Sequence, residues 1–310
     1  MPARVGIVVR TVDRPEFLTR ALADVDGQSL NDWHVVVVDD GTDRARVDEV
    51  VAASAIADRV TVIGAREPGG RCAAANSGVE SLDTEFIVVH DDDDLWDAEF
   101  LTRTVGWLDE HPTDVGVGVA TAIVYEERTD GAWVETSRVP FWADLDALRF
   151  TDLLEVNRAV PISLLYRRSI HETVGFYDET LDAVEDWEFY LRVLAVATLG
   201  FIGGEPLAFW TQRPGVTGAD GNSMTALGHL HDRDDLIIRD RKLREWVAVN
   251  GAGLPLYIAD LERRIRRDLR QEIENALERQ RADIRADIDS HQPVWSRLRR
   301  LRRRLGRSTR

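Results

Sequence analysis

Apolar and polar positions follow two alternating patterns along the first 110 residues. Short runs of consecutive apolar residues, typical of strands buried on both faces, alternate with segments whose apolar residues recur every three or four positions, as in amphipathic helices. The expected strands are RVGIVVRT (4–11), WHVVVVDDG (33–41), RVTVIGA (59–65) and FIVVH (86–90). The expected helices cover 13–28, 44–57, a segment of small residues from 71 to 82, and 97–110. This alternation predicts an α/β fold with a doubly wound, mostly parallel, Rossmann-like sheet.

The first helix carries its own start signal. Asp13 and Glu16 stand at the spacing of a capping box, and Pro15 lies in the first turn, where its missing N–H costs nothing. We therefore expect the helix to begin here, with Asp13 as its capping residue.

The pattern changes from residue 115 onward. VGVGVATAIVYEE and AWVETSRV flank Asp130-Gly131, a dipeptide typical of hairpin turns. Farther on we expect a helix at 144–156, the strand VPISLLYR, a helix ended by Gly175, a helix whose first turn carries Glu185 and Asp186, and short strands around GFIGG and PLAFW. These elements complete a first domain over residues 1–225.

Residues 226–310 read as a helical C-terminal extension. Apolar residues recur every three or four positions in a highly charged background, at Ile258, Leu261, Ile265, Leu269, Ile273 and Leu277. Such a narrow stripe favours either a helix packed on its own domain or a helix that joins copies of the chain in a homo-oligomer.

The chain ends in an arginine-rich tail. Residues 296–310 hold eight arginines and no acid, so with a total of −16 the rest of the chain carries −24. An acidic body argues against nucleic-acid binding, because phosphates require basic surface. As a helix, the tail would be basic and amphipathic and would contact an anionic membrane peripherally; as a solvated tail it would not.

Three features of the sequence indicate in which cellular compartment the protein is expected. No apolar run approaches the ~20 residues of a membrane span, and the N-terminus lacks the apolar core of a signal peptide. The single cysteine, Cys72, suits a reducing compartment. We expect a cytoplasmic protein, peripheral on the inner face of the membrane if its tail binds lipid.

Polar clusters follow four of the predicted strands and are expected to share one rim of the sheet, at 11–14, 39–40, 67–71 and 91–94. The last is a run of four aspartates. Two carboxylates ~4 Å apart repel by roughly 4 kcal/mol at an effective dielectric near 20. We interpret the run as a site that lacks its cation, and that cation as divalent.

Five segments in this order resemble family 2 glycosyltransferases with the GT-A fold: TVDRPEFLTRAL, VVVVDDGTD, GGRCAAANSGV, FIVVHDDDDLW and VEDWEFYLR. The resemblance spans about residues 4–215. It implies transfer of a sugar, with inversion, from a nucleotide-diphosphate donor to the hydroxyl of an acceptor such as a glycan, a glycolipid or a small molecule.

The resemblance also implies site residues. A Mg²⁺ or Mn²⁺ ion on the diphosphate would be held by Asp93 together with Asp91 and Asp94, because such ions take oxygen ligands. Asp186 corresponds to the catalytic base, and Glu185 would tune or orient it. The residues implied to contact the nucleotide sugar are Thr11, Asp13, Asp39, Arg71, Asp91 and Asp92.

Some positions depart from the family pattern. Val12 stands where an aromatic residue is common, which leaves the base of the donor open, and the arginine that the family places near the diphosphate is missing from Ala74-Ala75-Asn76. Arg71 would either take its place or only neutralise neighbouring acids. We expect Trp142, Trp187 and Trp210 in the core, and His229 and His231 facing solvent. Two other functions stay open, a nucleotidyltransferase that makes the sugar nucleotide and a non-catalytic protein that binds it.

Overall fold

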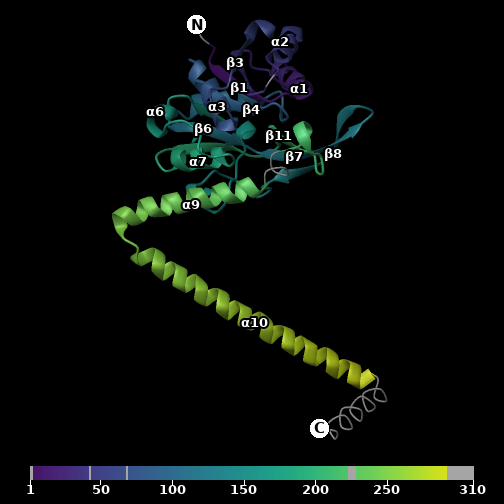
Figure 1. Ribbon diagram of the computed structural model, residues 1–310, viewed down its shortest axis with the longest axis vertical. Coiled ribbons are helices and arrows are strands. Elements are labelled where there is room, and N and C mark those ends of the chain that lie inside the picture. The colour runs from purple at the N-terminus through teal and green to yellow at the C-terminus, as the bar shows by residue number, and fades with distance from the viewer. Residues whose placement is uncertain (1–2, 42, 68, 223–227, 292–310) are drawn as a thin grey trace. The chain divides into compact units, whose positions relative to one another are not determined.

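The computed structural model describes residues 3–41, 43–67, 69–222 and 228–291 (Figure 1). Contacts divide the chain into two compact units, 1–239 and 240–310. The division at residues 225 and 226 expected from the sequence stays a prediction. Within the described residues, no helix is both long enough and apolar enough to cross a membrane.

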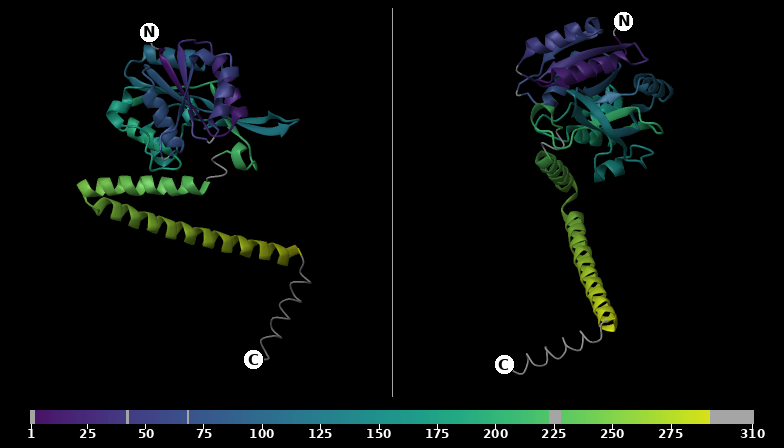
Figure 2. Two further views of the ribbon diagram at one scale, coloured as in Figure 1. Left: turned by 45° about the horizontal axis from the view of Figure 1, so that its top comes forward. Right: turned by 90° about the vertical axis from the view of Figure 1, so that its right-hand side faces the viewer.

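A seven-stranded sheet forms the centre of the first unit (Figure 2). Its order is β10-β6-β9-β4-β1-β2-β3, and only β9 runs antiparallel to its neighbours. The strands are β1 (Val5–Thr11), β2 (Trp33–Asp39), β3 (Val60–Gly64), β4 (Phe86–Asp91), β6 (Asp114–Val119), β9 (Leu164–Arg167) and β10 (Thr198–Ile202). The predicted α/β fold with a mostly parallel sheet is confirmed.

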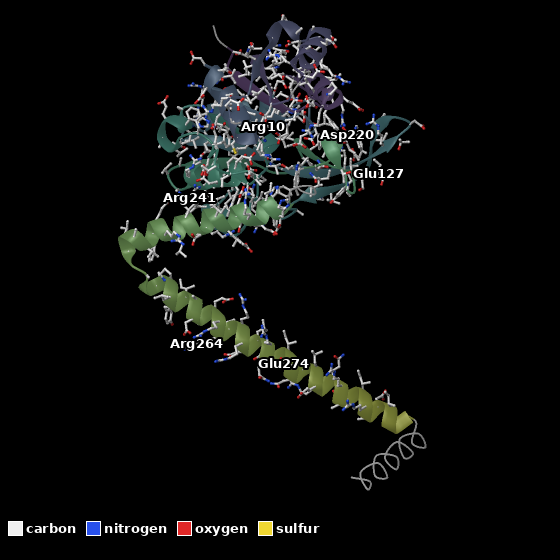
Figure 3. All side chains as sticks on the ribbon, viewed as in Figure 1. Arg10, Glu127, Asp220, Arg241, Arg264 and Glu274 are labelled. Atoms are coloured by element: carbon white, nitrogen blue, oxygen red, sulfur yellow. The ribbon has the colours of Figure 1, made fainter. Side chains whose placement is uncertain are left out.

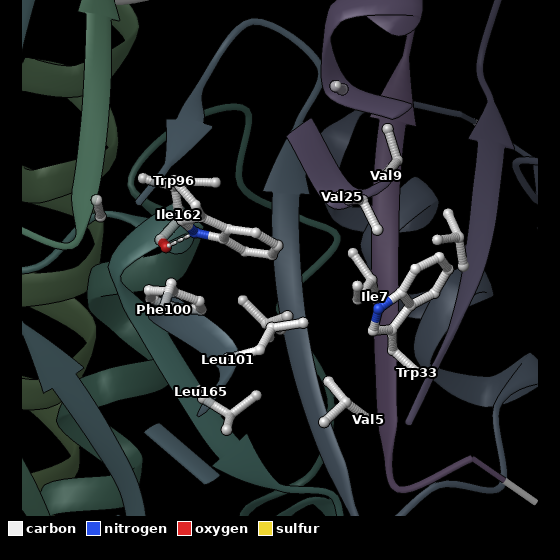
Figure 4. Packing of buried hydrophobic residues seen from close by; sticks show 14 of the residues in the cluster. Val5, Ile7, Val9, Val25, Trp33, Trp96, Phe100, Leu101, Ile162 and Leu165 are labelled. Carbon is white, nitrogen blue, oxygen red and sulfur yellow. Dashed lines mark hydrogen bonds between the residues drawn. The ribbon is translucent and has the colours of Figure 1, made fainter. Parts of the chain in front are cut away.

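Alternate residues of the strands face two hydrophobic cores, one on each side of the sheet. Val5, Ile7 and Val9 join the core under α1 (Pro15–Asp26), α2 (Arg44–Ala53) and α4 (Phe100–Glu110). Val8 and Val36 join the core under α3 (Arg71–Ser81), α6 (Ile170–Val174) and α7 (Glu185–Leu194). Figure 4 shows part of the first core, in which the indole of Trp96 donates to the carbonyl of Ile162 at 2.7 Å. Each fully buried aliphatic side chain contributes about 1.5–3 kcal/mol.

A second, four-stranded sheet has the order β5-β11-β7-β8. Its strands are β5 (Leu95–Trp96), β7 (Thr121–Thr129), β8 (Ala132–Phe141) and β11 (Ala208–Gln212). The predicted hairpin is confirmed, with Asp130 and Gly131 at φ 50° and 86°. The segment VGVGVATAIVYEE, however, divides between β6 and β7, because the backbone of Ala120 bonds Ile202 and Leu207 instead of continuing one strand.

Two predicted helix starts differ in part from the structure. Pro15 lies in the first turn of α1, as predicted, but the expected capping box is absent. Arg14 is the N-cap residue of α1, and no side chain caps the helix. Asp13 instead adopts a left-handed conformation at φ 49° and accepts the N–H of Asp43 at 3.4 Å. The helix expected from 97 begins at Phe100, because the chain before it leaves strand β5 and the N–H of Asp97 still bonds the carbonyl of Leu207 next to β11.

Other boundaries shift by a few residues. The helix expected at 144–156 is α5 (Phe150–Glu155), and the strand expected at 160–167 begins with a 3₁₀ turn, η2 (Pro161–Ser163). Two further 3₁₀ turns are η1 (Ala57–Arg59) and η3 (Gly218–Asp220). Cys72, on α3, is buried.

The C-terminal part is helical, with α9 (Gly228–Asn250) and α10 (Gly253–His291). Most large apolar residues of α10 form one stripe, here called the apolar stripe, and are 44–58% exposed; Leu256 and Tyr257 lie outside it and are 69% and 65% exposed. Its members are Leu254, Ile258, Leu261, Ile265, Leu269, Ile273, Leu277, Ile284 and Ile288. The arginine-rich tail at 296–310 lies outside the described residues.

Candidate active site

The carboxyl ends of β1, β2 and β4 lie side by side. The parallel register sets Thr11 beside Asp39 and Arg10 beside Asp91. The loops that follow these strands therefore meet on one rim of the sheet, as expected for the polar clusters of the sequence.

Two adjoining cavities open on this rim. The first measures about 480 Å³ and its lining includes Thr11, Asp13, Arg14, Asp40, Asp93, Asp94 and Asn222. The second measures about 410 Å³ and its lining includes Trp142, Asn157, Glu185, Asp186 and His231. The residues common to both linings are Arg10, Arg71, Asp91 and Trp210. One wall thus serves both cavities.

Arginines neutralise the start of the aspartate run. Arg10, labelled in Figure 3, donates from Nε to Asp91 Oδ1 at 2.8 Å and also forms an ion pair with it through Nη2 at 2.6 Å. Although burial opposes ionisation, Arg10 and then Arg71 hold the pKa of Asp91 below its usual value. Asp92 is fully enclosed, accepts the Thr11 hydroxyl at 2.7 Å and pairs with Arg14.

A third arginine reaches the run from far along the chain. Arg213, itself fully buried, pairs with Asp93, which also accepts from Asn222 Nδ2 at 3.3 Å. Asp94 accepts the N–H of Thr211 at 2.9 Å. The aspartates therefore have cationic partners within the chain, which the sequence interpretation did not foresee, and the divalent cation stays a prediction. The roles of Arg10 and Arg14 could have been predicted, because both lie close in sequence to Thr11, at the rim where the aspartates were expected. No feature of the sequence around Arg213 indicated that it would contact the aspartates.

The aspartates differ in what they can offer a metal. The side chains of Asp91 and Asp93 are 28% and 11% exposed, and one oxygen of each accepts no hydrogen bond from the described residues. Burial and then the charges of Asp93 and Asp91 raise the pKa of Asp94 well above its usual value. In the part of the chain described, no three acids, histidines or cysteines are arranged to hold a metal alone. Asp91 and Asp93 fit a Mg²⁺ or Mn²⁺ ion that takes one or two carboxylates and completes its shell with phosphate and water.

The loop after β2 supports the first cavity from one side. Asp39 is buried and accepts the N–H of Gly41 at 2.9 Å, while Asp40 lines the cavity and accepts the N–H of Gly70 at 2.8 Å. A Cβ added at Gly41 would lie 2.5 Å from Asp13 Oδ1, so only glycine permits this approach. The tight contact fixes the position of Asp13 in the lining of the first cavity.

Arg71 stands at the first position of α3, in the wall common to both cavities. Its carbonyl accepts from Arg10 Nη1 at 3.1 Å, and its guanidinium lies 3.8 Å from Glu185. Its side chain is 29% exposed, so it retains donors for an anionic ligand.

The second cavity contains a carboxyl group with an unusual environment. Asp186 Oδ2 accepts from Asn157 Nδ2 at 2.9 Å, and Oδ1 accepts the N–H of Trp187 at 2.7 Å. Burial, followed by the charge of Glu185, raises the pKa of Asp186 to about 7. Glu185 itself is buried and accepts from Arg10 Nη1 at 2.9 Å. Asp186 is therefore a stronger base than an ordinary aspartate.

Helix α9 anchors the loop that leads into α7. The buried carboxylate of Asp234 accepts the N–H groups of Asp182 and Ala183 at 2.7 and 2.9 Å. Ile238 packs with Trp187 in a small apolar cluster. The first part of α9 thereby fixes the start of the helix that carries Asp186.

The predictions for the tryptophans and histidines are confirmed at some positions and not at others. Trp187 is a core residue, as expected, with its Nε1 bonded to Leu153 O at 2.6 Å. Trp142 and Trp210 are only partly buried and line the second cavity, so the core role predicted for them is incomplete. His229 is exposed, as expected, but His231 lines the second cavity, where burial and then Arg71 lower its pKa.

Residues 6–175 match the family model described as Glycosyl transferase family 2. The uncharacterized glycosyltransferase YwdF of Bacillus subtilis (strain 168) is 26% identical over 191 residues, which cover 61% of this chain and 67% of that protein. The succinoglycan biosynthesis protein ExoW of Rhizobium meliloti is 40% identical over 91 residues, 28% of each chain. A PGL/p-HBAD biosynthesis glycosyltransferase of Mycobacterium bovis is 26% identical over 190 residues, which cover 60% of this chain and 68% of that protein.

Two solved structures share the fold. The S. aureus protein TarS, in complex with UDP-GlcNAc, aligns with a TM-score of 0.52 and 17% identity over 81% of this chain and 75% of that one. The mannosyltransferase PcManGT from Pyrobaculum calidifontis, in complex with GDP-Man and Mn²⁺, aligns with a TM-score of 0.50 and 17% identity over 84% and 81%. These likenesses confirm the GT-A type of fold.

Proposed function

This chain belongs to glycosyl transferase family 2, and we propose that it moves a sugar from a nucleotide-diphosphate donor to an acceptor hydroxyl, with inversion at the anomeric carbon. The observation that carries the proposal is the pair of adjoining cavities, one lined by Asp91 and Asp93 and the other holding Asp186. An inverting displacement needs a leaving group and a base on opposite sides of one carbon. Cavities that share a wall can meet that requirement.

We assign the first cavity to the donor. Thr11, Asp13 and Asp91 line it, and Arg71 offers its guanidinium to the diphosphate from the shared wall. Asp39 remains the predicted contact to the base or ribose, through the loop that carries it.

Asp92 has a different role from its neighbours. Because it is enclosed and bonded to Thr11 and Arg14, we propose that it holds those two residues in place and does not contact the donor directly.

Asp91 and Asp93 would hold the Mg²⁺ or Mn²⁺ ion, with Asp94 next to them, where it accepts the N–H of Thr211. When bound, the ion would offset the negative charge that develops on the leaving diphosphate. Arg71 lies in the same wall and would share that task.

We assign the second cavity to the acceptor. Asp186 takes the proton of the acceptor hydroxyl as the oxygen attacks the sugar carbon, and its raised pKa suits it to that step near neutral pH. Trp142 and Trp210 present apolar rings on which the face of a sugar or an aromatic acceptor packs. The acceptor, whether glycan, glycolipid or small molecule, would bring its free hydroxyl to Asp186.

The decisive variant is Asp186→Asn, which keeps the size of the side chain and removes the base. We expect the rate of sugar transfer to fall by about 10³-fold or more, measured by a transfer assay. Donor binding should be retained, measured by thermal shift with UDP- and GDP-sugars with and without Mn²⁺. Asp146→Asn, the same change on an exposed pair with Arg149, should leave both unchanged. Full turnover in Asp186→Asn would instead support a non-catalytic role for this residue, and a nucleotide-sugar binding protein would show no turnover in any form.

A nucleotidyltransferase has less support. Such enzymes place a glycine-rich phosphate loop after the first strand, whereas β1 here is followed by Val12-Asp13-Arg14. A cytoplasmic location and the absence of nucleic-acid binding stay predictions.

A further inference from the structure

Helix α10 presents an apolar surface that no other described residue of its own unit buries. Every member of the apolar stripe is exposed, and none of the α10 side chains described is buried. Burial of such side chains contributes about 25 cal/mol for each Å² removed from water. A stripe along the whole of a helix therefore favours a partner that is itself long and narrow.

The apolar stripe is symmetric about Gln271. Leu269 and Ile273 lie equally far on either side of it, as do Leu254 and Ile288 near the helix ends. The same holds for Ile258 with Ile284 and for Ile265 with Leu277. A second copy of α10 in the opposite direction, related by a two-fold axis at Gln271, would set an apolar residue against an apolar residue in all of these layers.

One layer departs from this symmetry. Leu261 would face Arg281 of the second copy, since these two residues also lie equally far from Gln271. An arginine tolerates that place because its aliphatic stem packs on leucine while the guanidinium stays in water.

Charges along one edge of the stripe show the same relation. Glu262, Arg266, Arg270, Glu274 and Glu278 follow at intervals of four residues, and Arg281 comes next, so all lie beside the stripe. In the antiparallel pair, three charges of one copy lie next to opposite charges of the second copy. These pairs are Arg266 with Glu278, Arg270 with Glu274, and Glu262 with Arg281. A parallel pair in register would bring like charges level with each other instead.

Several of these charges have no partner within the described chain. Arg266 pairs with Glu262 in its own helix, but the structure gives Arg270, Glu274 and Glu278 no ion pair with any described residue. Figure 3 labels Glu274 on α10. We propose that the occupant of the apolar stripe is α10 of a second copy of this chain, antiparallel and centred on Gln271.

The first test of the proposal is the molecular mass of the protein in solution, which distinguishes a dimer from a monomer. Light scattering after gel filtration of the full chain should give twice the 34.9 kDa of one copy. Arg270→Glu alone and Glu274→Arg alone should each weaken the dimer by about tenfold, since the two-fold axis places every reversed charge twice. The double variant Arg270→Glu/Glu274→Arg should restore it. Arg267→Glu, the same charge change on the opposite face, should have no effect.

The direction of pairing is tested by cross-linking. When Ile258→Cys and Ile284→Cys proteins are mixed and oxidised, the antiparallel pair predicts a disulfide between the two variants and little within either alone. Cys72 is buried and stays out of the reaction. Disulfides formed by Ile258→Cys alone would indicate a parallel pair and overturn the proposal.

Two further outcomes would also overturn it. One is a wild-type chain that stays monomeric at all concentrations. The other is a monomer whose stripe binds vesicles of phosphatidylglycerol and phosphatidylcholine, shown by co-sedimentation that Leu269→Asp abolishes. Equal dissociation constants for the single and double charge variants would argue against the register.

Discussion

At the scale of single residues, Arg10 joins the two halves of the site. Its guanidinium contacts Asp91 on the donor side and Glu185 beside the base, and it also bonds the carbonyl of Arg71. Only the planar fork of arginine can serve carboxylates in two directions at once. The relative placement of donor and base therefore depends on one side chain.

We expect Arg10→Lys to lower kcat/KM by about 10- to 100-fold, because an ammonium group cannot hold both carboxylates in this geometry. Steady-state transfer assays measure the effect. The matched control is Arg4→Lys, which alters a fork between Glu85 and Asp109 on the surface and should leave kcat/KM unchanged. Equal activity in both variants would show that Arg10 has no part in aligning the site.

The hydrogen bond from Asn157 should set the pH at which Asp186 becomes active. That bond favours the ionised carboxylate, against the burial that raises the pKa of Asp186 to about 7. The base works unprotonated, so kcat/KM should rise tenfold per pH unit below about 7 and then level off. Asn157→Ala should raise the pKa further and move this limb to higher pH, measured by pH profiles. An unshifted limb would assign it to another group.

At the scale of elements, the loop after β2 is held by a close contact in addition to the hydrogen bond that Asp40 accepts from Gly70. Gly41 lies under Asp13 with no room for a side chain. We expect Gly41→Ala to displace Asp13 or the loop, weakening donor binding by about tenfold and lowering the free energy of unfolding by about 1–3 kcal/mol. Calorimetric titration and denaturant unfolding measure the two effects. Gly106→Ala, at a helix position with open space around the added Cβ, should weaken neither.

The elements of the main sheet could be predicted because buried parallel strands are apolar throughout. The hairpin of the second sheet was predicted, but the assembly of that sheet was not, because β5 has two residues and pairs with β11, which lies more than a hundred residues later. Pattern alone carries no information about such distant pairing. For the same reason the sequence placed Asp91 and Asp186 as candidate site residues but did not show that Arg213 neutralises Asp93, a partner that only the fold brings close.

At the scale of the whole molecule, the two units divide their tasks. Both hydrophobic cores and all residues named in the two cavities belong to residues 1–239. The apolar stripe belongs to the second unit. Catalysis and self-association should therefore be separable.

We expect a chain ended after Asn250 to unfold cooperatively, to bind donor as the full chain does, and to be monomeric. Scanning calorimetry, donor titration and light scattering measure these properties. A truncated chain that still dimerised would place the interface in the first unit.

The carboxylate of Asp234 sets a lower limit on how far a working fragment must extend. The family match ends at residue 175, yet Asp182 and Ala183 take their hydrogen-bond acceptor from α9, more than fifty residues downstream. A fragment ended near residue 215, where the resemblance to the family ends, would still contain Asp182, Ala183 and Asp186 but would leave those two amides without their acceptor. Homology therefore understates the smallest piece of this protein worth expressing.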